Sequence, residues 1–248
     1  PGRTDEYLSA SALRQTAEVT NPVRVDIRDK ALKTMDRFMR NDPAIKIQYI
    51  SRFASIANAW KKWLGEMQGL QTYKAVAKRQ EYEAEFVRRI NQNPDWKIRY
   101  NNLLPRLNQT HKDMEPYAEA RDNYLETFLR NVQVMGLASG LTNWVKTYDD
   151  GNLSAFSAKI KEVDGQMAGA FKEMNPAVDK AVFAVLAERF AKTMRPEWGG
   201  AYVKSEAERL GGFDKLADYL YANSALTNPD RWASLAAGDA SALGKALS

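Results

Sequence analysis

The chain has 248 residues, of which 44% are hydrophobic and 27% are charged, and its formal net charge is +5. This composition is that of a globular protein with a sizeable core, and it excludes a disordered chain. The absence of cysteine excludes disulfides, thiolate nucleophiles and cysteine-ligated metals, and no apolar run reaches the length of a membrane span.

The first residues, PGRTDEYL, contain neither a Met nor a recognisable signal peptide. From this start we expect the sequence to be a segment of a longer or processed protein.

Helix starts are marked by a repeated dipeptide, because five of the nine prolines directly follow Asn or Asp. Asn and Asp cap the first free N–H groups of a helix, and proline suits the first turn because its missing N–H is not needed there. A stretch with helical spacing of apolar residues follows each pair, which predicts an amphipathic helix. The pairs are Asn21-Pro22, Asp42-Pro43, Asn93-Pro94, Asn175-Pro176 and Asn228-Pro229. The clearest apolar stripe consists of Val178, Val182, Leu186, Ala187 and Phe190.

Neither β-strand alternation nor a hairpin turn between β-branched runs is present, so the sequence predicts an irregular all-α domain of about ten helices. Gly65 and Gly69 are expected to end the third helix. Gly136 and Gly140, inside a helical stretch, fit either close packing or a hinge. In chain order, we expect helices near residues 9–19, 22–40, 43–64, 70–92, 95–110, 113–148, 153–173, 176–194, 203–210, 213–223 and 229–237.

The residues that carry common catalytic chemistry are scarce in this chain. His111 is the one histidine, and its place near an expected helix end favours a capping or surface role. Neither a G-x-S-x-G elbow nor a Walker-type loop occurs, and no spacing of ligands suits a metal. We therefore predict no catalytic residue, no metal and no cofactor within this chain.

The segment RFASIANAWKKWL, residues 52–64, has an apolar side and a narrow polar side. At about 100° per residue, Asn58 falls opposite the apolar stripe, on a strip with small neighbours. An amide is uncharged yet can accept a hydrogen bond from an ammonium group, so Asn58 fits a ligand for a peptide N-terminus. An asparagine on a solvent-exposed face is the alternative. The strip consists of Ser51, Ala54, Ser55, Asn58 and Lys62.

Three stretches resemble the bacterial serine dipeptidyl-peptidases of serine family forty-six, both the dipeptidyl-peptidase 7 type and its acidic-specific relative. They are PGRTDEYL, NPVRVDIRDKALKTMDRFMRNDPAIKIQY and SRFASIANAWKKWLGEMQGL, and the block ASIANAWKKWLGE is the most specific part. The resemblance is strongest over residues 1–90 and continues in helical character through most of the chain.

The resemblance implies that residues 1–248 are the helical capping domain that this family inserts into a chymotrypsin-like double β-barrel. Residues 1–8 would be the connection from the first barrel, and residues 236–248 the connection to the second barrel or a tail. The catalytic His, Asp and Ser would all lie outside this segment, so the segment alone should be inactive.

The resemblance also implies a function for the parent protein, a serine exopeptidase of the aminopeptidase type that removes dipeptides from free peptide N-termini. The helical domain would act as lid and ruler over the cleft, and Asn58 would bind the substrate α-amino group. Oligopeptides, the β-barrel domain of the same chain and a second copy in a homodimer would be its partners. The resemblance implies a periplasmic or exported protein that binds neither nucleic acid nor membrane.

Two other classes of function fit parts of the sequence. A stand-alone helical binding or scaffolding module would have the same helical pattern without any peptidase segment nearby. A nucleic-acid binder would use the positive excess of residues 1–100, but the basic residues there alternate with acidic ones, as in KRQEYEAEFVRR. That alternation favours solvated helix faces with side-chain pairs.

Overall fold

A computed structural model describes residues 7–248, and within that part the chain is helical without any β-strand. The predicted all-α class is therefore confirmed. The residues before Tyr7, which hold most of the predicted connection at residues 1–8, lie outside the described part. The α-helices are α1 (Ala10–Gln15), α2 (Asn21–Asn41), α3 (Pro43–Thr72), α4 (Ala75–Asn91), α5 (Pro94–Tyr100), α6 (Leu103–Tyr124), α7 (Gln133–Asp149), α8 (Leu153–Ala158), α9 (Ile160–Glu173), α10 (Pro176–Thr193), α11 (Gly200–Leu210), α12 (Phe213–Asn223), α13 (Pro229–Ala236) and α14 (Ala240–Leu247). Two π-helical segments, η1 (Thr16–Thr20) and η2 (Leu125–Arg130), and two 3-10 turns, η3 (Pro196–Trp198) and η4 (Ala225–Thr227), complete the order.

The chain divides into two compact units, which we call unit 1 and unit 2. Among the described residues, unit 1 contains residues 7–26 and 57–123, and unit 2 contains residues 27–56 and 124–248. Helices α2 and α3 therefore each contribute to both units.

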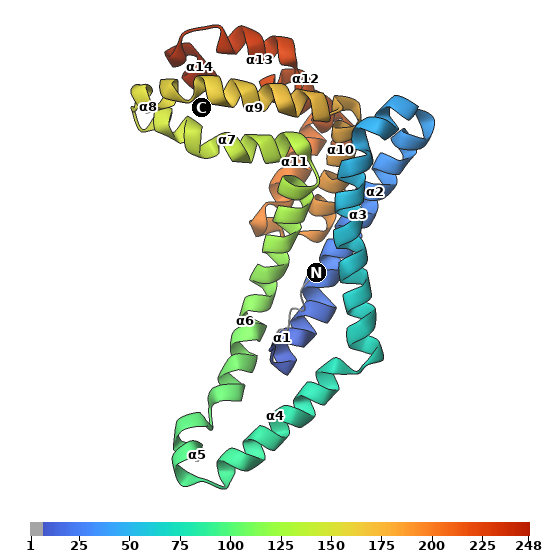
Figure 1. Cartoon of the computed structure of the whole chain (residues 1–248), viewed down its shortest axis with the longest axis vertical. Helices are drawn as coiled ribbons and strands as arrows, with labels where there is room; N and C mark the ends of the chain where they lie inside the picture. The colour runs from blue at the N-terminus through green and yellow to red at the C-terminus, as the bar shows by residue number, and fades with distance from the viewer. Residues whose placement is uncertain (1–6) are drawn as a thin grey trace. The chain divides into compact units, whose positions relative to one another are not determined.

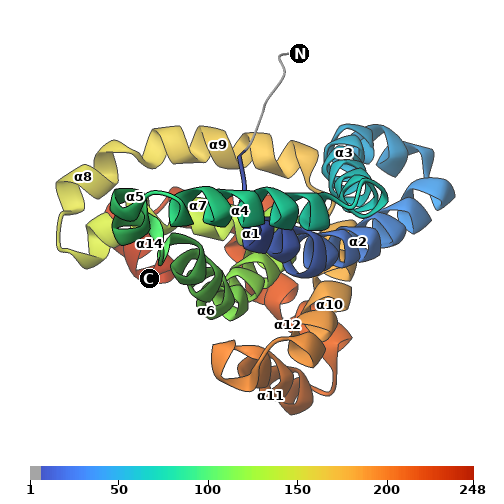
Figure 2. The ribbon, with the colours of Figure 1, turned by 90° about the horizontal axis from the view of Figure 1, so that it is seen from below.

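In unit 1, α1 packs against α4, as Figure 2 shows. The backbone N–H of Ala10 at the start of α1 donates to Oε1 of Glu83 in α4, over 2.7 Å. Helix α6 contacts α1 through two polar pairs. Arg14 forms an ion pair with Glu115 at 3.0 Å, and Gln15 lies 2.8 Å from the Nδ1 of His111. Polar contacts thus join α1 to both α4 and α6.

Helix α10 is the centre of unit 2 and packs against α11, α12 and η2. Its whole predicted stripe, from Val178 to Phe190, is buried, so that prediction is confirmed. The side chain of Asn175 accepts hydrogen bonds from the N–H groups of Ala177 and Val178, as an N-cap should. Asn93 and Asn228 cap α5 and α13 in the same way.

A second apolar core of unit 2 is built by α7, α8, α9, α13 and α14 (Figure 1). The ring of Trp144 stacks on that of Phe156 with centroids 4.3 Å apart, and its Nε1 donates to the Phe156 carbonyl. Leu243 of α14 is buried in this core, and Gly244 lies against the ring of Tyr148. Within the predicted connection at residues 236–248, residues 240–247 thus form a packed helix.

Two expected helix boundaries are wrong near the N-terminal part. Asn21-Pro22 does not start a new helix after a break, because the π-helical η1 leads directly into α2. Asn21 is buried and donates through Nδ2 to Glu66 over 2.9 Å instead of capping. Gly65 and Gly69 do not end α3, which continues to Thr72, and the turn comes at Lys74 with a left-handed φ of 48°. A glycine costs a helix only about 1 kcal/mol, which its helix-forming neighbours can offset.

The expected helix over residues 113–148 is also wrong, because η2 ends at Arg130 and Val132 is extended, with φ −103° and ψ 116°. The side chain of Asn131 is buried and donates through Nδ2 to the Glu126 carbonyl over 2.6 Å. The new helix α7 is capped by Asp179, which lies in α10. The break thus depends on a partner far away in sequence. In the other direction, α6 runs through residues 110–113, where a break was expected, and contains Pro116.

Candidate functional site

The polar strip of α3 lies on an exposed side of that helix, as the sequence predicted. Ile56, on the other side, is buried. The side-chain amide of Asn58 forms no hydrogen bond with any residue in the described part of the chain. Its donors and acceptor are therefore available to a ligand. All five residues of the strip are exposed: Ser51, Ala54, Ser55, Asn58 and Lys62.

In unit 2, the part of α3 that precedes Asn58 borders a polar cavity of about 590 Å³. Because Ser51 and Ser55 are four residues apart, they lie on the same face of the helix. Arg130 at the end of η2 and Glu173 at the end of α9 belong to other walls. The lining residues are Arg28, Gln48, Ser51, Arg52, Ser55, Ile56, Arg130, Gln133 and Glu173.

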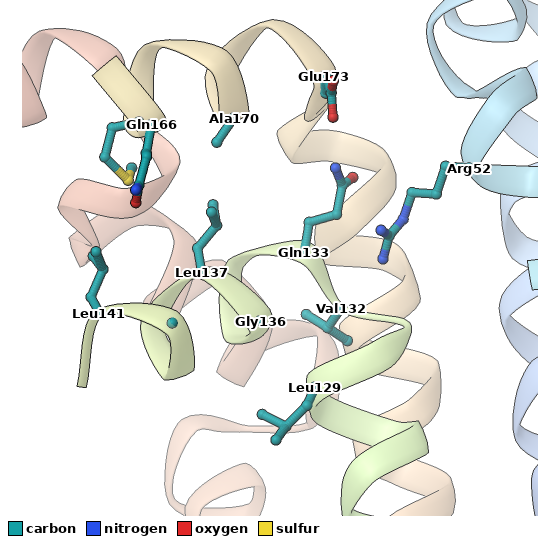
Figure 3. Close-up of a pocket in the computed structure, with 12 residues that line it drawn as sticks. Arg52, Leu129, Val132, Gln133, Gly136, Leu137, Leu141, Gln166, Ala170 and Glu173 are labelled. Carbon is teal, nitrogen blue, oxygen red and sulfur yellow. The ribbon is translucent and has the colours of Figure 1, made fainter. Parts of the chain in front are cut away.

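A second cavity of about 310 Å³ shares three lining residues with the first: Arg52, Gln133 and Glu173. Figure 3 shows Arg52 reaching from α3 toward Gln133 at the start of α7, with Glu173 at the end of α9. The rest of this second cavity is mainly apolar and includes Leu137 and Gly136. A Cβ at Gly136 would lie 3.1 Å from the Leu129 carbonyl oxygen, a tight approach that favours glycine there, whereas a Cβ at Gly140 would meet no described atom within 4 Å beyond its own stretch of helix. A polar compartment thus adjoins an apolar one.

Arg52 is held at the junction of the two cavities by backbone carbonyls. Its Nη2 donates to the carbonyl of Arg130 over 3.3 Å and to that of Asn131 over 3.0 Å. Burial lowers the pKa of the Arg52 guanidinium, while the negative charge of Asp179 acts in the opposite direction. Its Nε is buried and has no hydrogen-bond partner within the described residues. Arg52 is therefore a positioned cation that lacks a carboxylate contact.

Asp179 fixes the start of α7, and with it the position of Gln133 beside Arg52. Its carboxylate accepts from the backbone N–H groups of Gln133 and Val134, over 2.6 and 3.0 Å, and from the hydroxyl of Tyr221 over 2.6 Å. Burial raises the pKa of the Asp179 carboxyl, and these hydrogen bonds oppose the rise. The hydroxyl of Tyr49 donates to Oε1 of Gln133 over 2.6 Å, and burial raises the pKa of that phenol. Both Gln133 and its helix are thereby fixed.

Arg28 lines the polar cavity and forms a buried ion pair with Glu126. Its Nε donates to Oε2 of Glu126 over 2.7 Å, and its Nη2 lies 3.3 Å from Oε1. The two side chains are only 11% and 9% exposed. Glu126 therefore neutralises Arg28 directly, and little of the positive charge of Arg28 remains to attract a ligand.

The residues that the sequence singled out do not come together in one cluster. His111 lies within α6 in unit 1 and contacts Gln15, so it is not at a helix end. Within residues 7–248, no group of three His, Asp or Glu side chains could hold a metal ion. No helix of the described part is both long and apolar enough to cross a membrane.

The sequence did not reveal the cavity residues Arg52, Arg130 and Glu173. Arg52 stands at the first position of the quoted segment, but an arginine at the border of an apolar stripe usually covers it with its stem. Arg130 and Glu173 each end a helical segment, and only the packing of α3, η2 and α9 places them around one cavity. The capping role of Asp179 had no local signal either, because its partners are in α7.

The profile of the family described as peptidase S46 matches residues 1–247. The Asp/Glu-specific dipeptidyl-peptidase of Capnocytophaga gingivalis is 38% identical over 230 residues, which are 92% of this chain and 31% of that protein. The enzyme of the same name from Flavobacterium psychrophilum is 33% identical over 252 residues, 100% of this chain and 34% of that protein.

Solved structures agree with these sequence matches. The crystal structure of Porphyromonas endodontalis DPP11 has a TM-score of 0.77 at 17% identity, and covers 100% of this chain and 36% of that chain. A structure of the same protein in complex with the dipeptide Arg-Glu has a TM-score of 0.73 at 16% identity. The chain thus spans about a third of the length of the relatives it matches.

Proposed function

The chain belongs to the peptidase S46 family, and we propose that it is the helical capping domain of a serine dipeptidyl-peptidase. The relatives named above are dipeptidyl-peptidases, and the whole chain has the fold of about a third of one of them. The rest of such a protein would supply the catalytic triad. The helical domain would cover the cleft, and peptides with a free N-terminus would be the substrates. Residues 1–8 and 236–248 would connect it to the two β-barrels.

The observation that carries the substrate role is the free amide of Asn58. This side chain is exposed on α3 and has no hydrogen-bond partner in the described part of the chain. Its carbonyl oxygen can accept a hydrogen bond from the substrate ammonium group, and such charge-assisted bonds are the stronger ones. We assign Asn58 to the binding of the substrate α-amino group.

An ammonium group anchored at a fixed point would determine where the chain is cut. Held by Asn58, a peptide would present its second peptide bond to the nucleophile, and only dipeptides would be released. Anchoring of this kind converts binding into correct positioning of the reacting atoms. Closure of the helical domain over the peptide would exclude water and complete the site. The parent protein would be periplasmic or exported and would form a homodimer.

The test is the substitution Asn58→Ala in a longer protein that contains this chain together with the catalytic domain. Loss of a hydrogen bond to a charged group should lower kcat/KM for dipeptidyl substrates by roughly ten- to a hundredfold. Asn58→Asp keeps an acceptor and should retain more activity than Asn58→Ala. Lys62→Ala, on the same strip one turn further, is the matched control and should change little. An Asn58→Ala enzyme as active as the Lys62→Ala enzyme would refute the assignment.

A further inference from the structure

The polar cavity of unit 2 has two arginines without a carboxylate partner. Arg28 is neutralised by Glu126. Arg52, in contrast, donates only to backbone carbonyls. The guanidinium of Arg130 is exposed and makes neither a hydrogen bond nor an ion pair with any residue between 7 and 248. Two cationic groups at this cavity are therefore available to an anion.

The two arginines line the same cavity, and neither has a carboxylate partner among the described residues. The guanidinium of Arg52 contacts the backbone of Arg130 itself, over 3.3 Å. Burial lowers the pKa of Arg52, the negative charge of Asp179 opposes this change, and the like charge of Arg28 makes a smaller contribution in the direction of burial. Cations gathered in this way are stabilised when an anion binds among them. The positive charges of Arg52 and Arg130 therefore lack a counter-charge that a bound anion would supply.

Further donors face the same cavity from α3. The hydroxyls of Ser51 and Ser55 are exposed, and neither has a hydrogen-bond partner within the described residues. The Nη1 of Arg52 also makes no hydrogen bond in that part of the chain. Guanidinium and hydroxyl groups together suit the oxygens of an anion.

The charge balance of the cavity favours a singly charged anion. Once Arg28 is paired with Glu126, the remaining charged lining residues are Arg52, Arg130 and Glu173, which leave one net positive charge. A carboxylate would balance this single excess charge, whereas a dianion would exceed it and would be repelled more strongly by the Glu173 carboxylate. The planar guanidinium also matches a carboxylate in shape and can bind both of its oxygens.

We propose that this cavity is a carboxylate-binding site for peptides, in which Arg52 and Arg130 hold the carboxylate and Ser51 and Ser55 donate hydrogen bonds to it. That the ligand is a peptide rests on the proposed function. The carboxylate belongs either to an acidic side chain or to the C-terminus of the peptide, and both present the same group to the arginines. The apolar second cavity, which shares Arg52, would receive a neighbouring apolar group of the ligand.

The test uses N-acetylated peptides, which have no ammonium group and so cannot use Asn58. Binding of three probes to the full 248-residue chain is followed by NMR titration. Acetyl-Gly-Glu-Gly-amide carries a side-chain carboxylate, acetyl-Gly-Gly-Gly a C-terminal one, and acetyl-Gly-Gln-Gly-amide none. We expect at least one carboxylate probe to bind several-fold more tightly than the neutral probe and to shift the signals of Ser55 and Arg130. Which of the two binds identifies the source of the carboxylate.

Substitution of the exposed arginine then locates the site without disturbing the fold. Arg130→Gln should weaken binding of the carboxylate probe about three- to tenfold, and added salt should weaken binding to the unchanged protein. The matched control is Arg37→Gln, an equal loss of charge at an exposed position of α2 outside the cavity. Equal binding of all three probes, or equal affinity of the two variants, would overturn the proposal. Neither result depends on peptidase activity, so the role of Asn58 stands or falls separately.

Discussion

Asp179 of α10 accepts a hydrogen bond of 2.6 Å from the backbone N–H of Gln133, 46 positions earlier in the chain. The same carboxylate accepts from the next N–H group, that of Val134. These are the first two residues of α7, so the carboxylate satisfies free donors and places negative charge at the positive end of the helix. A residue of the central helix thereby fixes the position of Gln133, which lines both cavities.

Removal of this cap should destabilise unit 2. Asp179→Ala leaves two backbone N–H groups and the Tyr221 hydroxyl without their acceptor, so we expect a loss of about 2–4 kcal/mol in the free energy of unfolding. Denaturant unfolding followed by tryptophan fluorescence, with Trp144 and Trp232 in unit 2, measures it. Asp150→Asn, at an exposed position after α7, should change stability by less than about 0.5 kcal/mol. A loss below about 1 kcal/mol in Asp179→Ala would show that the cap is dispensable.

The buried ion pair of Arg28 and Glu126 should respond strongly to loss of one partner. Glu126→Gln leaves the guanidinium buried without a counter-charge, and we expect it to cost about 3 kcal/mol or more. The double variant Arg28→Met with Glu126→Gln should lose less than the sum of the two single variants, because no charge remains unpaired. A double-mutant cycle measures this difference.

The surface ion pair of Lys192 and Glu188 is the control for that cycle. Its atoms are as close, at 2.6 Å, but the side chains are 68% and 47% exposed. Glu188→Gln should therefore cost less than about 1 kcal/mol. Similar coupling energies for the two pairs would contradict the importance that we give to burial.

The sequence predicted those elements whose signals are local. The Asn-Pro caps at Asn93, Asn175 and Asn228 and the buried stripe of α10 depend on neighbours within one helix, and they were predicted correctly. The break before α7 was missed because its cap, Asp179, comes from another helix. The same holds for the candidate site. Asn58 could be chosen from the spacing within α3 and a resemblance, whereas Arg130 joins the cavity only through the tertiary packing.

Glycines in helices should divide into two classes on substitution. A Cβ at Gly244 would clash with the ring of Tyr148, so Gly244→Ala should destabilise the second core of unit 2 by about 1–3 kcal/mol. A Cβ at Gly169 in α9 would meet no described atom within 4 Å beyond its own stretch of helix. Gly169→Ala should therefore stabilise the protein by about 0.5–1 kcal/mol through better helix propensity. Thermal unfolding of the two variants tests the contrast, and shifts of equal sign would disprove it.

Glu85 in α4 should titrate well below the ordinary range of a glutamate. Hydrogen bonds from Arg88 at 2.6 Å and from Arg89 at 2.7 Å lower the pKa of its carboxyl from 4.5 to about 2. Since the pKa is lower in the folded state, the stabilising effect is present above pH 4.5 and is lost as the pH falls toward 2. An NMR titration of the Glu85 side chain measures the midpoint directly.

The same titration in two variants separates these contacts from the general charge of the helix. Arg88→Gln removes the donor with the largest effect and should move the Glu85 midpoint back up toward 4.5. Arg79→Gln removes an equal charge from the same helix, at a residue that lies over the Tyr82 ring instead, and should leave the midpoint almost unchanged. High salt should raise the midpoint in the unchanged protein, because the pair is exposed and its charges are screened. A midpoint near 4.5 in the unchanged protein at low salt would show that the two arginines do not hold the carboxylate in solution.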